Sequence, residues 1–473
     1  MRLQSLRFDV AKFRHFNLVV VAVGVLYVVA GGWAMSRLRY DIWGTFLAVP
    51  AIAVIMVPII ARMFREAPMV ARIAYVGLAT KCLGTIARYW VAFDAYGGAA
   101  DAQAYHDFGR IYAAKIRSGA VPPWGLIPHG QGTRFMEHLT GALYTFTGAS
   151  KQAGFMWFSA LGFAGVLLCI KAAMIAVPTV SIERYALLCC ISPSLVFWPS
   201  SVGKESWMSI SFGVLAMGMA QLFATKQLLR PLGLAVAGAV GAVVVRPHIA
   251  VVWLAAAVAA VVWRVVGRRT GTSSSRMTSA FVLLVGLVGL VAVGRLALQF
   301  LGENDSASVS SQLNNAFGRT SHLTAGGGSE FAPPSVATPL DYPMAVIRTL
   351  TRPLLYEVNG LSTLLPAIET TAIIILALWG FRRLMALPGM LRRSPFIVFH
   401  LLVVVMGALA YSSFSNLAIL VRQRSLLMPS LLIILCLAPW TARVLPTPKA
   451  GAALGGHAHR SPATRHDAKA VAP

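Results

Sequence analysis

Long apolar runs constrain this chain more than any other feature of its sequence. Runs of about 18 to 24 residues recur throughout its 473 residues, and about 20 helical residues are enough to cross a hydrocarbon core of roughly 30 Å. Only 12% of the residues are charged, whereas soluble globular proteins have roughly 25%. The sequence therefore excludes an ordinary soluble protein and predicts an all-α, polytopic bundle of transmembrane helices.

Hydropathy windows of about 19 residues predict about twelve membrane spans. The basic segment before the first run resembles a signal peptide, but the length of that run and the spans that follow favour an uncleaved first span. The predicted spans lie near residues 17–35, 43–62, 70–93, 154–177, 185–199, 206–224, 231–247, 249–266, 277–299, 365–381, 395–414 and 418–438.

The net charge of +25 would suggest nucleic-acid binding in a soluble domain, but membrane proteins use Lys and Arg to mark their cytoplasmic loops. With the N-terminus inside, about 23 of the 41 basic residues fall inside and about 12 of the 16 acidic residues outside. This distribution predicts a bacterial inner (plasma) membrane protein with both termini in the cytoplasm and no nucleic-acid partner. Residues 1–445 would form the membrane domain, with long outer loops near 94–153 and 302–364, and residues 446–473 a disordered cytoplasmic tail.

The sequence gives no indication of a disulfide, a metal site or a cofactor. All five cysteines lie inside apolar runs, which is typical of thiols that pack as small apolar side chains. The loop near residues 306–339 has a mobile composition, and just before it Glu303 to Asp305 is only a loose match to the D-x-D metal motif of nucleotide-sugar enzymes.

The segment DAQAYHDFG, residues 101–109, follows the third predicted span. Tyr105, Phe108 and Tyr112 recur at helical spacing, which predicts an apolar stripe on a helix that lies at the membrane interface. Asp101 would occupy the first turn of that helix. Two interpretations of Asp101 stay open: a helix N-cap, and a functional carboxylate at the boundary between water and lipid.

The segment FWPSSVGKESW, residues 197–207, resembles the end of a phosphate-binding P-loop. Trp198 stands where that motif requires glycine, and Glu205 replaces the magnesium-binding Ser or Thr, so a nucleotide site is excluded. Lys204 nevertheless lies in the first turn of the next span, where free backbone N–H groups favour an anion. The alternative is an interfacial lysine that binds lipid headgroups or pairs with Glu205.

Three later segments place further polar side chains on the same predicted face. A buried arginine such as Arg422 needs a partner, so a functional role is its default interpretation. Several cations beside a carboxylate suit a lipid-linked phosphate next to a hydroxyl that loses a proton. The segments are VVRPHIAVVW with Arg246 and His248, TRPLLYEVNG with Arg352 and Glu357, and SNLAILVRQRS with Arg422.

This layout resembles the bacterial multi-pass membrane glycosyltransferases of the GT-C type and the related polysaccharide polymerases. The resemblance implies transfer of a sugar from a polyprenyl-phosphate donor, surrounded by membrane lipids, to an envelope glycan or glycolipid acceptor at the outer face. It identifies Asp101 with the catalytic carboxylate of those enzymes, although in the GT-C pattern the acidic motif directly follows the first span. The expected donor phosphate-binding residues are Lys204, Arg246, Arg352 and Arg422, and the expected acceptor- or sugar-binding residues are Tyr105, His106, His248 and Glu357.

Three alternatives to a single-transfer enzyme stay open at the level of sequence. A polymerase of the O-antigen type would use the same donor repeatedly. A transporter or flippase for a lipid-linked or anionic solute would use the same cations, but it would need polar residues deep in several spans, and Lys81 is the one charge assigned to mid-depth. A non-catalytic scaffold for envelope assembly is the third alternative.

Overall fold

The computed structural model describes residues 24–37, 40–95, 97–98, 101–267, 273–301, 309–326, 329–334, 336, 338–358 and 360–439. In these ranges the chain is helical apart from turns and one isolated bridge between Glu330 and Asn416. The prediction of an all-α fold is thereby confirmed for the described residues. The predicted tail at 446–473, the beginning of the first predicted span and the residues 303–305 lie outside the described residues.

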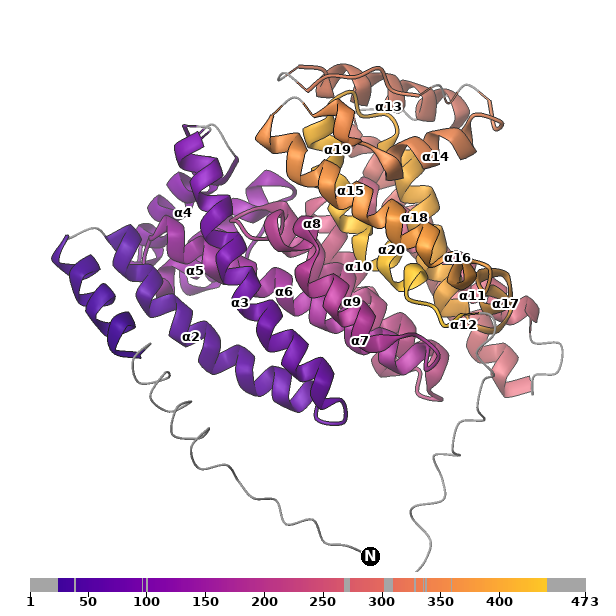
Figure 1. Ribbon diagram of the computed structural model, residues 1–473, viewed down its shortest axis with the longest axis horizontal. Helices are drawn as coiled ribbons and strands as arrows, with labels where there is room; N and C mark the ends of the chain where they lie inside the picture. Colours follow the sequence, from indigo (N-terminus) through magenta and orange to yellow (C-terminus); the bar gives the residue numbers. More distant parts are fainter. Residues whose placement is uncertain are drawn as a thin grey trace, which may run out of the picture. The chain divides into compact units, whose positions relative to one another are not determined.

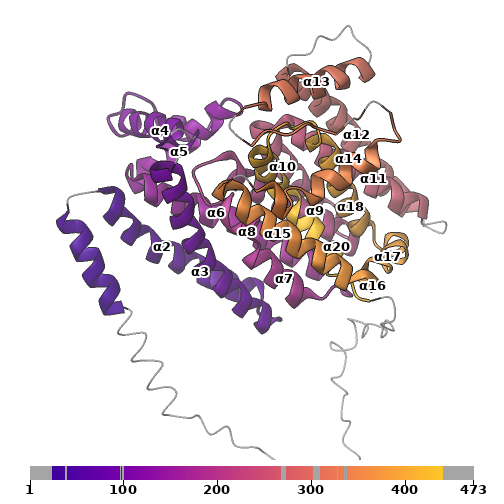
Figure 2. The ribbon, with the colours of Figure 1, turned by 45° about the horizontal axis from the view of Figure 1, so that its top comes forward.

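The helices follow one another along the chain as shown in Figures 1 and 2. A first helix covers Gly24–Ser36. It is followed by α2 (Tyr40–Met63), α3 (Pro68–Trp90), the π-helical turn η1 (Val91–Ala95), α4 (Asp101–Arg117), η2 (Pro123–Leu126), α5 (Thr133–Thr147), α6 (Lys151–Ala176), α7 (Ile182–Ile191), α8 (Pro193–Phe197), α9 (Lys204–Ala224), α10 (Leu229–Val245), α11 (Pro247–Gly267), α12 (Ser273–Leu301), α13 (Val309–Thr324), α14 (Tyr342–Thr351), η3 (Leu355–Glu357), α15 (Leu361–Trp379), α16 (Phe381–Leu384), α17 (Leu387–Arg393), α18 (Pro395–Tyr411), α19 (Leu417–Arg424), η4 (Ser425–Leu427) and α20 (Met428–Leu435).

Seven helices in the described ranges are long and apolar enough to cross a membrane, or eight if one bent pair counts as a single span. That pair joins Thr363–Trp379 to Phe381–Arg393 at an angle of 72°. The predicted number of twelve is not confirmed. Three further predicted spans correspond to the shorter apolar helices Gly24–Ser36, Leu229–Val245 and Pro395–Tyr411.

The predicted span at 185–199 is not one continuous helix. It is divided between α7 and α8, because Ser192, which precedes Pro193, has an extended ψ of 121°. A proline disfavours the helical conformation in the residue before it and cannot donate a backbone hydrogen bond to the preceding turn. The two pieces have 10 and 5 residues, so neither could cross a bilayer alone.

Helix α9 lies in the centre of the bundle, because it packs against both α6 and α10. The contact with α6 is backbone to backbone: a Cβ built on Gly213 would lie 2.4 Å from the carbonyl oxygen of Gly165. Small residues allow such close approach between membrane helices. The central position of α9 fixes its first residues, Lys204 and Glu205, against several neighbours.

The two predicted outer loops contain regular structure. Residues 101–147 hold α4 and α5, which pack against each other, and Val309–Thr324 of the predicted mobile loop is helix α13. The predicted apolar stripe of Tyr105, Phe108 and Tyr112 packs largely against α5, and the position of α4 at the membrane interface stays a prediction. Tyr105 is 1% exposed, and the ring centroids of Phe108 and Tyr112 lie 5.3 and 4.7 Å from that of His138 in α5.

Candidate functional site

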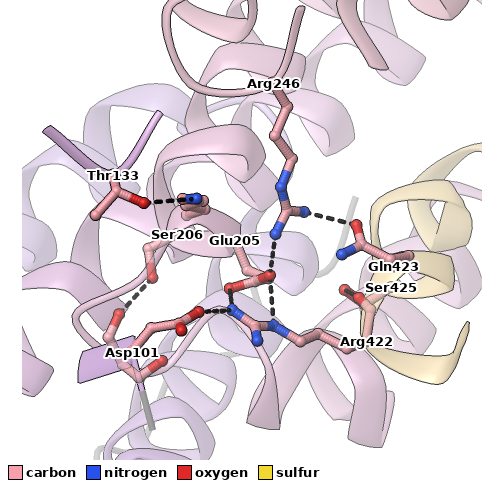
Figure 3. A network of polar contacts seen from close by, with 10 residues as sticks. Asp101, Thr133, Glu205, Ser206, Arg246, Arg422, Gln423 and Ser425 are labelled. Carbon is pink, nitrogen blue, oxygen red and sulfur yellow. Dashed lines mark hydrogen bonds and ion pairs between the residues drawn. The ribbon is translucent and has the colours of Figure 1, made fainter. Parts of the chain in front are cut away.

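A buried carboxylate, Glu205, is the centre of the largest group of ionic contacts described (Figure 3). Its side chain is 2% exposed. It accepts hydrogen bonds from Nη2 of Arg246 at 2.6 Å, and from Nε and Nη2 of Arg422 at 2.7 and 3.1 Å. Charge-assisted bonds of this kind offset the desolvation of buried ions only when the geometry is close to ideal. We call Asp101, Glu205, Arg246 and Arg422 the Glu205 cluster.

Each arginine of the Glu205 cluster is placed by a helix end. Arg246 terminates α10, where its backbone N–H still donates to Ala242, and Pro247 then begins α11. Arg422 lies in α19, whose start is capped by the Asn416 side chain. The side chain of Gln423 joins the two elements, because its Oε1 accepts from Nη1 of Arg246 at 2.7 Å.

Asp101 is the exposed member of the Glu205 cluster. It is the first residue of α4, and 58% of its side chain is accessible. Its Oδ2 lies 3.3 Å from Nη2 of Arg422, the same nitrogen that donates to Glu205. Arg422 therefore connects a buried carboxylate to one that water or a ligand can reach.

Lys204 and Tyr105 meet at Thr133, the first residue of α5. Nζ of Lys204 donates to Oγ1 of Thr133 at 3.2 Å, and the Tyr105 hydroxyl is a further neighbour of that side chain. Burial, together with the nearby Asp101 carboxylate, raises the pKa of Tyr105 to about 12. The Tyr105 hydroxyl thus remains protonated at neutral pH and can act as a donor beside Asp101.

The structure does not bring every predicted residue to the Glu205 cluster. Arg352 and Glu357 form a local ion pair, with Nε of Arg352 donating at 2.6 Å, and the Arg352 guanidinium lies 4.5 Å from the centre of the Phe331 ring. His106 is 6% exposed and its Nδ1 lies 3.0 Å from the Tyr144 hydroxyl. His248 lies in the first turn of α11, two residues after Arg246.

A second polar group, on either end of α8, was not predicted as a unit. At the beginning of α8, Glu369 of α15 accepts from the hydroxyls of Ser192 and Ser194, and from the Ser194 backbone N–H at 3.0 Å. At its end, Nζ of Lys81 donates to the carbonyl of Leu195 at 2.9 Å. A carboxylate at the start and an ammonium at the end complement the helix dipole.

Glu369 is a further charged residue within a candidate span, besides Lys81. Glu369 interrupts the apolar run of residues 361–379 and is 5% exposed. A single acidic residue in such a run is the sequence signal that could have identified it. Lys81 also donates to Pro199 and Ser200, at 3.2 and 2.9 Å, and so fixes the segment that leads to Lys204.

A mainly apolar cavity of about 590 Å³ lies between α3, α8 and α15. Arg88 forms part of its wall, with its guanidinium 5.0 Å from the rings of both Phe197 and Trp198. Glu369 lines the cavity as well. Along the chain, the cavity residues Ala95 and Trp198 each precede a site residue, Asp101 and Lys204, by six positions.

Within the described ranges, no group of three or more His, Cys, Asp or Glu side chains could hold a metal ion. All five cysteines are free, four of them buried and Cys82 partly buried. No protein-family model matches the chain, and neither a curated protein nor a solved structure matches it. The site is therefore interpreted from its own geometry.

Proposed function

We propose that this protein is a membrane glycosyltransferase of the bacterial inner membrane. It transfers a sugar from a polyprenyl-phosphate donor to an envelope glycan or glycolipid acceptor at the outer face. One observation carries the proposal: the exposed carboxylate of Asp101 lies 3.3 Å from Arg422, beside Arg246 and Lys204. At this site the leaving-group phosphate would contact cations. The acceptor hydroxyl would lie beside a carboxylate that can accept its proton.

The proposed reaction is a single displacement. The acceptor oxygen attacks the anomeric carbon, the bond from that carbon to the phosphate oxygen breaks, and the lipid phosphate leaves with the electron pair. Asp101 takes the hydroxyl proton. Arg422 and Lys204 stabilise the negative charge that develops on the phosphate, and Arg246 keeps Glu205 and Arg422 in place.

The apolar cavity between α3, α8 and α15 supports a donor that arrives from the bilayer. Trp90 and Leu365 line it and are 53% and 44% exposed on candidate spans, so the cavity borders the surface that faces lipid. In the proposed arrangement the hydrocarbon chain of the donor occupies this cavity and its phosphate binds the Glu205 cluster.

The test uses purified protein in liposomes, polyprenyl phosphate as the binding probe and a panel of polyprenyl-phosphate hexoses and pentoses as donors. We expect Asp101→Asn to bind polyprenyl phosphate at least as tightly as the unsubstituted protein, because the phosphate no longer competes with Asp101 for Arg422, but to lose sugar transfer at least 100-fold. Arg422→Gln should weaken binding of the probe at least tenfold. Arg110→Gln removes an exposed arginine from α4 and should change neither quantity. Full transfer by Asp101→Asn would refute the proposal.

A transporter or flippase for a lipid-linked or anionic solute is the second candidate, and the polar contacts around α8 favour it. Discontinuous spans that carry buried charges are typical of transporter binding sites, and Lys81 and Glu369 bind the two ends of such a break. In sealed liposomes without acceptor, a flippase would move labelled polyprenyl-phosphate sugar between leaflets unchanged. The glycosyltransferase would instead leave its distribution constant and release polyprenyl phosphate once acceptor is added. A polymerase would extend the acceptor by several sugars.

A further inference from the structure

An exposed group of aromatic, aliphatic and basic side chains lies on the region of α4 and α5, apart from the Glu205 cluster. Trp124 and Ile127 are on the connection between the two helices, and Phe146 is on α5; their exposed fractions are 72, 69 and 78%. Lys115 and Arg117 on α4 are exposed as well. We call these five residues the basic aromatic rim.

Three contacts hold the rim together. The Val121 backbone N–H donates to the Lys115 backbone carbonyl at 3.1 Å, which folds the connection back onto α4. The Tyr112 hydroxyl donates to the Gly125 carbonyl at 3.1 Å and so places Trp124 beside α4. Nη1 of Arg117 donates to the Tyr144 carbonyl at 3.1 Å, which brings this cation to the end of α5 that carries Phe146.

The rim is also held at the level where membrane helices begin. The Tyr40 hydroxyl, at the start of α2, donates to the carbonyl of Thr147 at the end of α5. Asp41 accepts from the backbone N–H of Lys151, the first residue of α6, at 2.7 Å. Both α2 and α6 are candidate spans, and both ribbon views place α4 and α5 beside each other near the start of α2 (Figures 1 and 2).

Exposed aromatic and basic side chains near the starts of membrane spans are suited to the boundary between hydrocarbon and lipid headgroups. Trp is enriched where hydrocarbon meets headgroups, because its ring is amphipathic, and Lys and Arg close to that boundary attract anionic lipids. We propose that the basic aromatic rim docks on the surface of the bilayer, with Trp124, Ile127 and Phe146 among the headgroups. Lys115 and Arg117 then bind the anionic headgroups.

Docking of the rim would fix α4 relative to the membrane, and Asp101 is the first residue of α4. This inference does not depend on the proposed activity, because it concerns lipid contact alone. The experiment places a bimane fluorophore on Trp124→Cys, with the unsubstituted protein labelled in parallel to measure reaction of the native cysteines, four of which are buried. The labelled protein is reconstituted in vesicles of phosphatidylcholine, with or without 25% phosphatidylglycerol.

We expect bimane at position 124 to be quenched by lipids that carry a nitroxide near the headgroup and to be protected from iodide in water. Phosphatidylglycerol should increase the lipid quenching, and the double substitution Lys115→Gln and Arg117→Gln should abolish that increase. Arg134→Gln removes an exposed arginine at the opposite end of α5 and should leave it unchanged. Quenching by iodide without quenching by lipid would overturn the proposal, because it would show that position 124 faces water. An equal loss in Arg134→Gln would overturn the role of the two rim cations.

Discussion

Replacing Glu205 with Gln should destabilise the protein strongly, although the two side chains have the same shape. The glutamine keeps one oxygen, but its amide N–H₂ would face guanidinium N–H groups that now have no acceptor. Three hydrogen bonds end on the Glu205 carboxylate, from Arg246 and from two nitrogens of Arg422.

The magnitude follows from burial. Removing one partner of a buried ion pair costs about 3–5 kcal/mol, because the other charge stays desolvated. Glu205 is 2% and Arg246 8% exposed, whereas Arg422 at 26% can turn partly toward water. We therefore expect a loss of about 3–5 kcal/mol, borne chiefly by Arg246. Asp101→Asn is the matched control: this side chain is 58% exposed with one ionic contact at 3.3 Å, so its cost should be about 1 kcal/mol or less.

The free energy of unfolding would be measured by SDS titration in mixed micelles, followed by tryptophan fluorescence. A double-mutant cycle with Arg422→Gln should show coupling of about 0.5–3 kcal/mol, since one partner is already lost in the single variant. Equal stability of Glu205→Gln and Asp101→Asn would refute the reasoning, because it would mean that Glu205 is hydrated or already neutral.

Three further variants test other parts of the structure. Lys81→Met should lower the free energy of unfolding by about 1–3 kcal/mol in the same SDS titration, because the carbonyls at the end of α8 lose their donor. Lys81→Arg keeps a cationic donor and should lose less of this free energy. Gly165→Ala should destabilise by about 1–3 kcal/mol or more, since its Cβ would clash with the Ser209 carbonyl oxygen. Gly233→Ala lies inside α10 with open space around it and should stabilise by up to about 1 kcal/mol. Burial lowers the pKa of His106 in the folded protein from its ordinary 6.5. Neutral His106 therefore contributes fully to the free energy of unfolding above pH 6.5, and this contribution is lost as the pH falls toward the folded-state pKa. Thermal unfolding between pH 7.5 and 5 should thus depend less on pH in His106→Gln.

Hydropathy was sufficient to predict the class of fold but not the continuity of its helices. A window average reports how apolar a segment is, and it treats Ser192–Pro193 like any other pair of residues. The break between α7 and α8 depends instead on backbone sterics at a single position. Likewise, the helical spacing of Tyr105, Phe108 and Tyr112 predicts an apolar stripe on α4 but not the element that packs against it, which is α5.

The sequence predicts which charged residues lie at helix ends near the site. It does not predict which of them form ion pairs with one another. Charged residues at the ends of several spans were expected on one face, and Asp101, Arg246 and Arg422 do meet. Glu205 was considered only as a partner of Lys204, its neighbour in the chain. Its actual partners come from α10 and α19, and only tertiary packing could select them. Arg352 shows the converse, because its partner Glu357 lies five residues away.

The ionic contacts within the Glu205 cluster determine which carboxylate a bound phosphate would displace from Arg422. Two carboxylates balance two arginines, and Lys204 adds a cation whose hydrogen bond goes to a neutral hydroxyl. Of the two carboxylates bound to Arg422, Glu205 is held by three bonds and Asp101 by one longer contact. An arriving phosphate that competes for Arg422 would therefore displace Asp101 rather than Glu205. Under the proposed function, donor binding itself would release the Asp101 carboxylate to accept a proton, so that the base becomes available only when a leaving group is in place.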